Sequence, residues 1–329
     1  MRCARQALKK LCKAKDPEKN VMIYTTVFTT VLMMFIYMAC GFAAVKTKIA
    51  SQDHLKTVSA ILLYITTPCM VVNSFQNMEY SMENFKKTML FLAVSLIIQI
   101  LFFIILFLIF RKKFDDGRYR ILTAAAPLGN VGYFGVYLVS AIYPENPEVT
   151  CYSMAYVISM NILVYTLGNY LITKDKKFVS FKNALLNPCV LGGIAAIILY
   201  LLKIELPGVL STTVSVLGSM TTPLCMIILG MRLAAMSFKK IFTAPFAYAV
   251  SVIKLIIFPF FAYLCVAFLP FADDVFKGCM FALSAAPSAA IILSLAEFHG
   301  CEQELSANVL LMTSLLCIVT LPVLCMIVI

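Results

Sequence analysis

Long uncharged apolar stretches dominate this sequence and restrict what it can fold into. Five of them exceed the roughly 20 residues that a helix needs to cross a bilayer. They cover residues 21–45, 88–110, 149–173, 206–231 and 305–329. Only 13% of the 329 residues are charged, about half of the roughly 25% that is usual in soluble domains. The sequence therefore predicts an all-α polytopic (multi-pass) protein of the lipid bilayer, and its cysteine-rich spans and lack of a targeting segment favour a bacterial inner (cytoplasmic) cell membrane.

Ten spans are predicted from the apolar stretches and the short polar segments between them. Their approximate ranges are 21–45, 57–76, 88–110, 120–143, 149–173, 183–202, 206–231, 243–270, 277–296 and 305–328. Residues 1–20 precede the first span as a basic N-terminal extension. The brief polar connections predict a single membrane domain without a soluble module.

Prolines inside the spans indicate an internal repeat. Thr67-Pro68 in the second span matches Thr222-Pro223 in the seventh, and Ala126-Pro127 in the fourth matches Ala286-Pro287 in the ninth. The two offsets are almost equal, so residues 21–173 and 183–329 are predicted to be two five-span repeats. An odd number of spans inserts the second repeat upside down, which is typical of secondary transporters.

The loop charges predict the orientation in the membrane. The loops on one side carry fifteen Lys and Arg residues and those on the other side carry four. The positive-inside rule then places both termini outside. The basic extension adds seven charges to the opposite side and works against this orientation. Two explanations for the extension stay open: an amphipathic helix on the membrane surface, or a translation start near Met22.

The broken fourth and ninth spans are the predicted substrate site. Proline removes a backbone hydrogen bond, and unpaired backbone at membrane depth is tolerated only against protein or a water-lined cavity. A restarted helix offers amides that attract a carboxylate. The candidate binding residues there are Pro127, Gly129, Asn130, Pro287 and Ser288. The alternative is that both prolines are packing kinks.

Other polar residues within the spans complete the candidate set. Thr67, Thr222 and Asn73 could face the same site, and Asn73 could instead join helices by a hydrogen bond. Lys254 is the one charged residue deep in a span, and it could pair with an anion, cap a broken helix, lose its proton or snorkel to the surface. By contrast, Arg232 is interpreted as an interfacial anchor and Glu297 as a solvated loop charge.

Several other functional classes are disfavoured. The twelve cysteines contain no CxxC pair, and the only histidines, His54 and His299, lie near span ends, so neither a metal site nor a cofactor is predicted. The net charge of +11 comes from short loops, which indicates topology rather than nucleic-acid binding. The spans contain no His, Asp or Glu as an acid–base group, so the protein is not predicted to be an enzyme.

The motifs resemble those of the auxin efflux carrier family, whose bacterial members are often described as malate or malonate permeases. The residues that carry the resemblance lie in order along nearly the whole chain: Pro127-Leu128-Gly129-Asn130, Tyr165-Thr166-Leu167-Gly168, Asn187-Pro188, Pro223 to Gly230, Lys254 with Pro259, Ala286-Pro287, and Thr320-Leu321-Pro322. The basic extension departs from the family pattern.

The resemblance implies the fold of the bile-acid/sodium symporter superfamily, with crossing broken helices in spans 4 and 9. It implies a scaffold of spans 1, 2, 6 and 7, and a transport domain of spans 3–5 and 8–10. It further implies an elevator-like motion, homodimers through the scaffold and external termini. The loop between spans 5 and 6 lacks the long insertion of the plant hormone carriers, so auxin is not the expected substrate.

A carrier for a small mono- or dicarboxylate is the leading functional hypothesis. An inside-negative potential drives anion export by about 2.3 kcal/mol per charge per 100 mV, whereas uptake needs a coupled cation such as H+ or Na+. The absence of acidic residues within the spans favours a uniporter or exporter over a proton symporter. The alternatives are a sodium-coupled organic anion symporter, a channel, and an intramembrane enzyme or sensor.

Overall fold

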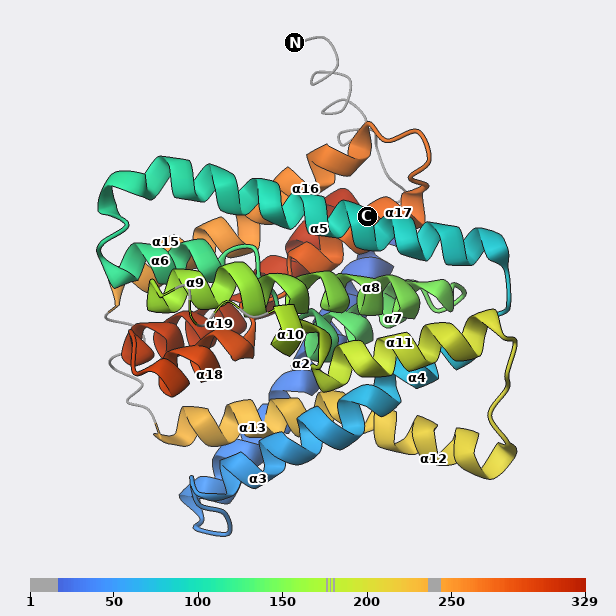
Figure 1. Ribbon diagram of the computed structural model, residues 1–329, viewed down its shortest axis with the longest axis horizontal. Helices are drawn as coiled ribbons and strands as arrows, with labels where there is room; N and C mark the ends of the chain where they lie inside the picture. Colours follow the sequence, from blue (N-terminus) through green and yellow to red (C-terminus); the bar gives the residue numbers. More distant parts are fainter. Residues whose placement is uncertain (1–16, 176, 178, 180, 236–243) are drawn as a thin grey trace.

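The computed structural model describes residues 17–175, 177, 179, 181–235 and 244–329. This part of the chain is built from helices, which Figure 1 shows in sequence order. Segment η2 is a 3-10 helix and the other η segments are π-helices. The elements are α2 Pro17–Lys46, α3 His54–Ile61, η1 Leu62–Thr66, α4 Thr67–Gln76, α5 Met82–Phe110, η2 Arg111–Lys113, α6 Gly117–Ala125, η3 Val131–Gly135, α7 Val136–Ile142, α8 Glu148–Leu163, η4 Val164–Gly168, α9 Asn169–Thr173, α10 Phe181–Leu185, α11 Pro188–Leu201, α12 Gly208–Ser219, α13 Thr221–Ala235, α15 Pro245–Val252, η6 Ile253–Ile257, α16 Phe258–Ala267, α17 Asp274–Ser284, α18 Ala290–His299 and α19 Gln303–Val328.

Seven helices in this part of the chain are long and apolar enough to cross a membrane, which supports the multi-pass prediction. Three shorter apolar helices, Val131–Ile142, Pro188–Leu201 and Ala290–His299, overlap the predicted fourth, sixth and ninth spans. A count of ten spans therefore requires that these spans cross with the help of neighbouring short helices. Both the count and the inverted repeat stay predictions.

Helix α5 shows how the spans meet the lipid. Its exposed side chains include Ile97, Leu101, Ile104 and Leu108, which recur at helical spacing along one face. Such a stripe would be unfavourable in water, whereas lipid tails solvate it as well as protein does. This helix therefore has one face toward the bilayer and one toward the protein.

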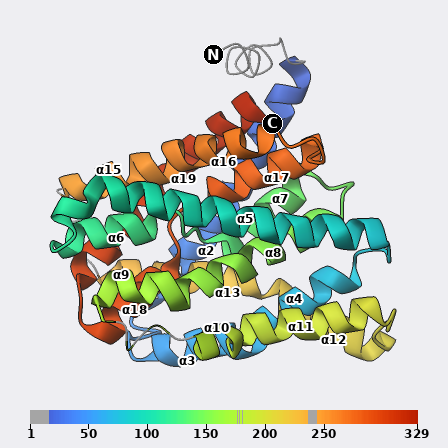
Figure 2. The same ribbon diagram turned by 45° about the horizontal axis from the view of Figure 1, so that its top comes forward.

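The helices form two groups, as Figures 1 and 2 show from different angles. In both views α3, α4, α11 and α12 lie on one side of the molecule, and α5, α6, α15 and α16 lie on the other. In the first group α13 packs along α2, and α4 packs against α11 and α12. In the second, α5 packs against α8, α16 against α17, and α15 against α19. Helix α2 also packs against α19 and α7 of the second group. The division into a scaffold and a transport domain therefore stays a prediction, as does their relative motion.

Two glycines allow α2 and α13 to approach closely. A Cβ atom at Gly230 would overlap the backbone carbonyl of Met38, and one at Gly41 would overlap that of Ile227. Small residues permit such backbone contact, which is a common device where membrane helices pack. The close packing of α2 against α13 therefore depends on these two glycines.

A π-helical turn accommodates the proline of the second predicted span. Segment η1 directly precedes α4, and Pro68 lies in the first turn of α4. The carbonyl of Leu62 accepts hydrogen bonds from the hydroxyls of Thr66 at 3.1 Å and Thr67 at 2.7 Å. The threonines thus stabilise the widened turn, and such turns are frequent at functional sites.

Three sequence-based boundaries differ from the structure. The predicted seventh span consists of two helices, α12 and α13, that meet at Met220. Pro223 therefore lies in the first turn of α13 and not in the middle of a continuous helix. The predicted sixth span begins with a separate helix, α10, and α11 starts only at Pro188. The Asn187 side chain caps the start of α11 by accepting a hydrogen bond from the Cys189 amide at 2.9 Å. Helix α2 begins at Pro17, earlier than the predicted first span, and residues 1–16 of the basic extension lie outside the described residues.

Candidate functional site

Two helices are interrupted at the predicted prolines. Helix α6 ends at Ala125, just before Pro127, and η3 starts at Val131. Similarly, α17 ends at Ser284 before Pro287, and α18 starts at Ala290. Proline cannot donate a backbone hydrogen bond and clashes with the preceding turn. Each break therefore leaves one helix ending and another beginning inside the molecule.

The two interrupted segments pair with each other. The Asn130 amide donates to the Pro287 carbonyl at 2.7 Å, and the Ala289 amide donates to the Leu128 carbonyl at 3.0 Å. Gly129 and Ser288 form an antiparallel β-bridge at the centre. This pairing satisfies backbone groups that would be costly to leave unpaired at membrane depth. We call the paired segments Leu128–Asn130 and Pro287–Ala289 the crossing.

Side chains cap both helices that end at the crossing. The Ser288 hydroxyl donates to the carbonyl of Ala125 at 3.2 Å, at the end of α6. The Lys254 ammonium donates to the carbonyl of Ser284 at 3.1 Å, at the end of α17. The Ser288 amide in turn donates to Thr313 Oγ1 at 3.1 Å. Ser288 and Lys254 therefore hold the crossing together.

Lys254 is the only charged side chain among the described residues that is buried. It lies in the π-helical segment η6, and its ammonium is 4.8 Å from the centre of the Phe258 ring. A Cβ atom at Gly129 would be 3.0 Å from its Nζ. Burying a lysine in a span costs at least about 2.5–3.5 kcal/mol on insertion scales. The carbonyl end of α17 and the aromatic ring offset part of this cost.

A small cavity lies where the two new helices begin. Its volume is about 60 Å³, enough for roughly two water molecules. One wall is formed by the starts of η3 and α18, and the facing walls by η1, α4, α8 and α11. The lining residues are Leu63, Thr67, Met70, Gly129, Asn130, Val131, Gly132, Tyr133, Val157, Met160, Asn161, Asn187, Cys189, Ala289, Ala290 and Ile291. None of these side chains is acidic.

Asn130 is the most distinctive polar group of this cavity. Its side chain is 3% exposed, and its amide nitrogen has no hydrogen-bond acceptor among the described residues. The thiol of Cys225 on α13 interacts with this side chain, but a thiol sulfur is only a weak acceptor. A buried donor without an acceptor is unfavourable by about 1–3 kcal/mol. The cavity is thus prepared to bind a group that accepts hydrogen bonds.

Two larger cavities connect this site to one end of the molecule. The first, of about 320 Å³, shares Leu63, Tyr133, Ala290 and Ile291 with the small cavity. The second, of about 580 Å³, shares Ser59, Arg232 and Ser294 with the first. We call the two together the vestibule. It opens between α3 and α13 on one side and α18 on the other, at the end whose loops carry most Lys and Arg residues.

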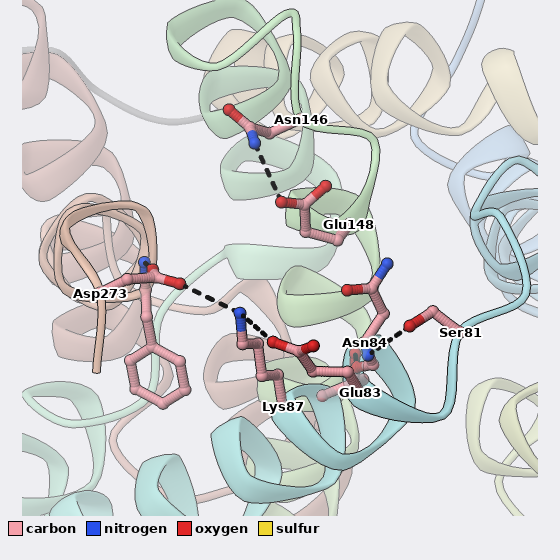
Figure 3. Close-up of polar contacts among 9 residues, drawn as sticks. Ser81, Glu83, Asn84, Lys87, Asn146, Glu148 and Asp273 are labelled. Atoms are coloured by element: carbon pink, nitrogen blue, oxygen red, sulfur yellow. Dashed lines mark hydrogen bonds and ion pairs between the residues drawn. The ribbon is translucent and has the colours of Figure 1, made fainter. Parts of the chain in front are cut away.

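Ion pairs at the opposite end join helices of the second group. Figure 3 shows Lys87 of α5 between Glu83 and Asp273, with nitrogen–oxygen distances of 3.1 and 3.5 Å. Asp273 also caps α17 by accepting the Phe276 amide at 2.8 Å. Helices α5 and α17 are therefore tied together at this end.

The structure divides the sequence-predicted site residues into three sets. Thr67, Gly129 and Asn130 line the small cavity. Pro287 and Ser288 belong to the crossing, Pro127 directly precedes it, and Lys254 lies behind it. Asn73 on α4 and Thr222 on α13 line neither the small cavity nor the vestibule.

Sequence reasoning missed three contributors to the site. Asn187, Tyr133 and Arg232 all line the cavities. From the sequence, Asn187 was named only as part of a family motif, and Arg232 only as an anchor. The position of Asn187 before a proline marks a helix cap, but nothing in its spacing indicates which neighbour it faces.

Comparison with family models gives a match along nearly the whole chain. A family model described as a membrane transport protein matches residues 26–180 and 175–325. Together these regions include both halves of the crossing. No curated protein matches the sequence.

Proposed function

We propose that this protein is a secondary carrier for a small organic anion. The chain belongs to the membrane transport protein family, also known as the auxin efflux carrier family. Malate, malonate or another carboxylate fits the chemistry of the site. One observation carries the proposal: two half-helix N-termini and the unpaired amide of Asn130 line the same cavity. These groups all favour a negatively charged acceptor.

The electrostatics of the crossing support an anion. Each helix start contributes up to about 2 kcal/mol in partly buried geometry, and a hydrogen bond from Asn130 to a charged group adds about 1.5–3 kcal/mol. Micromolar to millimolar affinity corresponds to roughly 4–8 kcal/mol. The sum reaches this range without an arginine in the cavity. Lys254, when protonated, adds positive charge on the far side of Gly129 from the cavity.

The size of the cavity supports a moving carrier. A volume of about 60 Å³ holds one carboxylate group but not a whole dicarboxylate. The crossing belongs to the group of α5–α9 and α15–α19, whereas α4, α11 and α13 supply the opposite walls. Sliding the first group against the second would enlarge the site and expose it alternately on each side, as in an elevator. With the positive loops in the cytosol, this structure is a cytosol-facing state.

The sodium-coupled alternative is less well supported. A coupling cation at the crossing would need several oxygen ligands, but the Ser284 carbonyl already accepts the Lys254 ammonium. The hydroxyl of Ser288 is directed to the Ala125 carbonyl. A fixed lysine thus supplies the positive charge that sodium would bring. This arrangement supports sodium-independent export driven by the membrane potential.

The remaining features of the proposal come from family resemblance. The scaffold would form a homodimer interface. The elevator assignment places α2–α4 and α10–α13 in the fixed part. Cross-linking across the scaffold in native membranes would test the dimer.

The proposal is tested by currents from reconstituted protein on a solid-supported membrane. The panel is malate, malonate, succinate, lactate, pyruvate and indole-acetate, each with and without sodium. We expect a saturable, sodium-independent current with one carboxylate, lost when Asn130→Ala and Pro287→Ala are combined. Thr212→Ala, on an exposed face of α12, is the control and should leave the current unchanged. An unaltered current in the folded double variant would contradict the proposed site.

A further inference from the structure

Arg232 lies at the outer end of the vestibule, between the two helix groups. It belongs to the last turn of α13, and its side chain is only 17% exposed. It lines both cavities of the vestibule. Its guanidinium contacts the Glu297 carboxylate and the Ser294 hydroxyl, both on α18 and both at 3.4 Å. Arg232 therefore lines the vestibule and is largely shielded from solvent.

Spacing along α13 connects Arg232 with the small cavity. Cys225, beside Asn130, precedes Arg232 by seven residues, which is almost two helical turns and about 10 Å along the axis. Both side chains therefore project from the same face of α13. On α18, Ala290 and Glu297 are separated by the same seven residues, with Ser294 between them. The vestibule thus has two facing walls that lead from Arg232 to the crossing.

The contacts of Arg232 leave it able to bind another carboxylate. A guanidinium has five donors, and charge-assisted hydrogen bonds are usually about 2.7–2.9 Å long. The contacts of Arg232 with both carboxylate oxygens of Glu297 and with Ser294, all at 3.4 Å, are longer than this. The Glu297 side chain is 49% exposed, so water can replace Arg232 as its partner. Arginine is also the side chain that matches a carboxylate in bidentate geometry.

We propose that Arg232 is a docking site for the carboxylate of the substrate, two helical turns from the crossing, and that Glu297 competes with the substrate for it. The arriving anion displaces Glu297 and pairs with Arg232. It then moves inward to the helix starts and Asn130. Lys56, which is exposed on α3 and lines the same cavity, adds positive charge at the opening. This inference rests on the proposed function, because it assumes an anionic substrate.

The proposal makes opposite predictions for the two partners. Arg232→Gln removes the docking group and should raise KM at the vestibule side about tenfold, with little change in kcat. Glu297→Gln removes the competitor and should lower KM severalfold. A purely structural latch between α13 and α18 would respond in the same direction to either change, since each breaks the same ion pair. Opposite shifts in KM therefore separate docking from latching.

The local potential is tested without knowing the substrate. Ser59 lines both vestibule cavities, and Ser59→Cys provides a thiol there. The reaction rates of this thiol with an anionic and a cationic methanethiosulfonate are compared in membranes, after subtraction of the rates in the unsubstituted protein. We expect Arg232→Gln to lower the anionic-to-cationic rate ratio about fivefold and Glu297→Gln to raise it. Arg118→Gln, which breaks an exposed pair with Asp116 at the same end, should not change it.

Malate and malonate serve as competing probes in the same assay. Either anion should slow the anionic reaction of the introduced thiol in the Ser59→Cys protein, but not when Arg232→Gln is added. An unchanged rate ratio in Arg232→Gln, or equal KM shifts in the two variants, would overturn the docking proposal. Failure of the proposed function has a different signature: the rate ratio would shift as expected, while no carboxylate on the panel would be transported or would protect the thiol.

Discussion

Replacing Lys254 with methionine tests whether a fixed charge behind the crossing supports anion binding. Its Nζ is 3.0 Å from the position of a Cβ at Gly129, and Gly129 lines the cavity. An anion in van der Waals contact with Gly129 would therefore be roughly 6–7 Å from the charge. At an effective dielectric constant of about 20, this separation corresponds to about 2.5 kcal/mol. With Lys254 protonated, Lys254→Met should thus weaken the apparent affinity by up to roughly 70-fold.

The assay is the concentration dependence of the transport current, with Lys86→Met as a matched control. Lys86 is an exposed residue of α5 and does not line the cavities. Lys254→Met removes a buried charge, which favours folding, but it leaves the Ser284 carbonyl without its donor, which opposes folding. We therefore expect little net change in the thermal stability of Lys254→Met. A folded Lys254→Met protein with native affinity would refute the electrostatic reasoning, because it would show that the lysine only caps α17.

Three further predictions concern the cavity, the scaffold and the linker between the helix groups. Asn130→Ala should weaken anion affinity about 10- to 100-fold, since it removes a hydrogen bond to a charged group. Asn130→Asp should weaken it further, because its carboxylate repels the anion. The dependence of the transport current on anion concentration measures both affinities. Gly230→Val should force α2 away from α13 and lower the thermal unfolding midpoint in detergent by several degrees. Gly208→Ala is the control and should leave the midpoint unchanged, because no atom lies within 4 Å of a Cβ at this position. An unshifted midpoint in Gly230→Val would argue against close packing of the two helices. Tyr200→Phe removes the hydroxyl that accepts a hydrogen bond from the Ser81 amide at 2.8 Å. Amide hydrogen exchange in residues 77–81, which link α4 to α5, should therefore accelerate severalfold. Unchanged exchange would show that this hydrogen bond does not stabilise the linker.

The helix breaks could be predicted from sequence because their cause is local. Pro127 and Pro287 lack the amide hydrogen that a continuous helix requires, and the structure has breaks at both. Similarly, Asn187 before Pro188 marks the start of α11. The break at Met220 was not predicted. The only proline nearby is Pro223, and a proline fits the first turn of a helix without strain, so its position does not indicate where the preceding helix ends.

The composition of the site could not be predicted in the same way. The pairing of Leu128–Asn130 with Pro287–Ala289 joins residues about 160 positions apart, and no local pattern specifies it. Asn73 and Thr222 are polar residues within spans, as Asn130 is, and only tertiary packing places them away from the cavity. Arg232 ends an apolar run, which is also what an interfacial anchor does. Its role depends on α18, which packs opposite α13 to form the vestibule.

Counterflow with radiolabelled anion in proteoliposomes tests the central claim most directly, because it detects exchange whether or not the cycle moves net charge. Vesicles are loaded with each unlabelled carboxylate of the panel and exposed to a trace of the same labelled compound. The account predicts transient accumulation of at least one carboxylate without sodium, strongly reduced by Asn130→Ala and retained in Thr212→Ala. Accumulation that is equal in Asn130→Ala, or no accumulation of any carboxylate by well-folded protein, would contradict it.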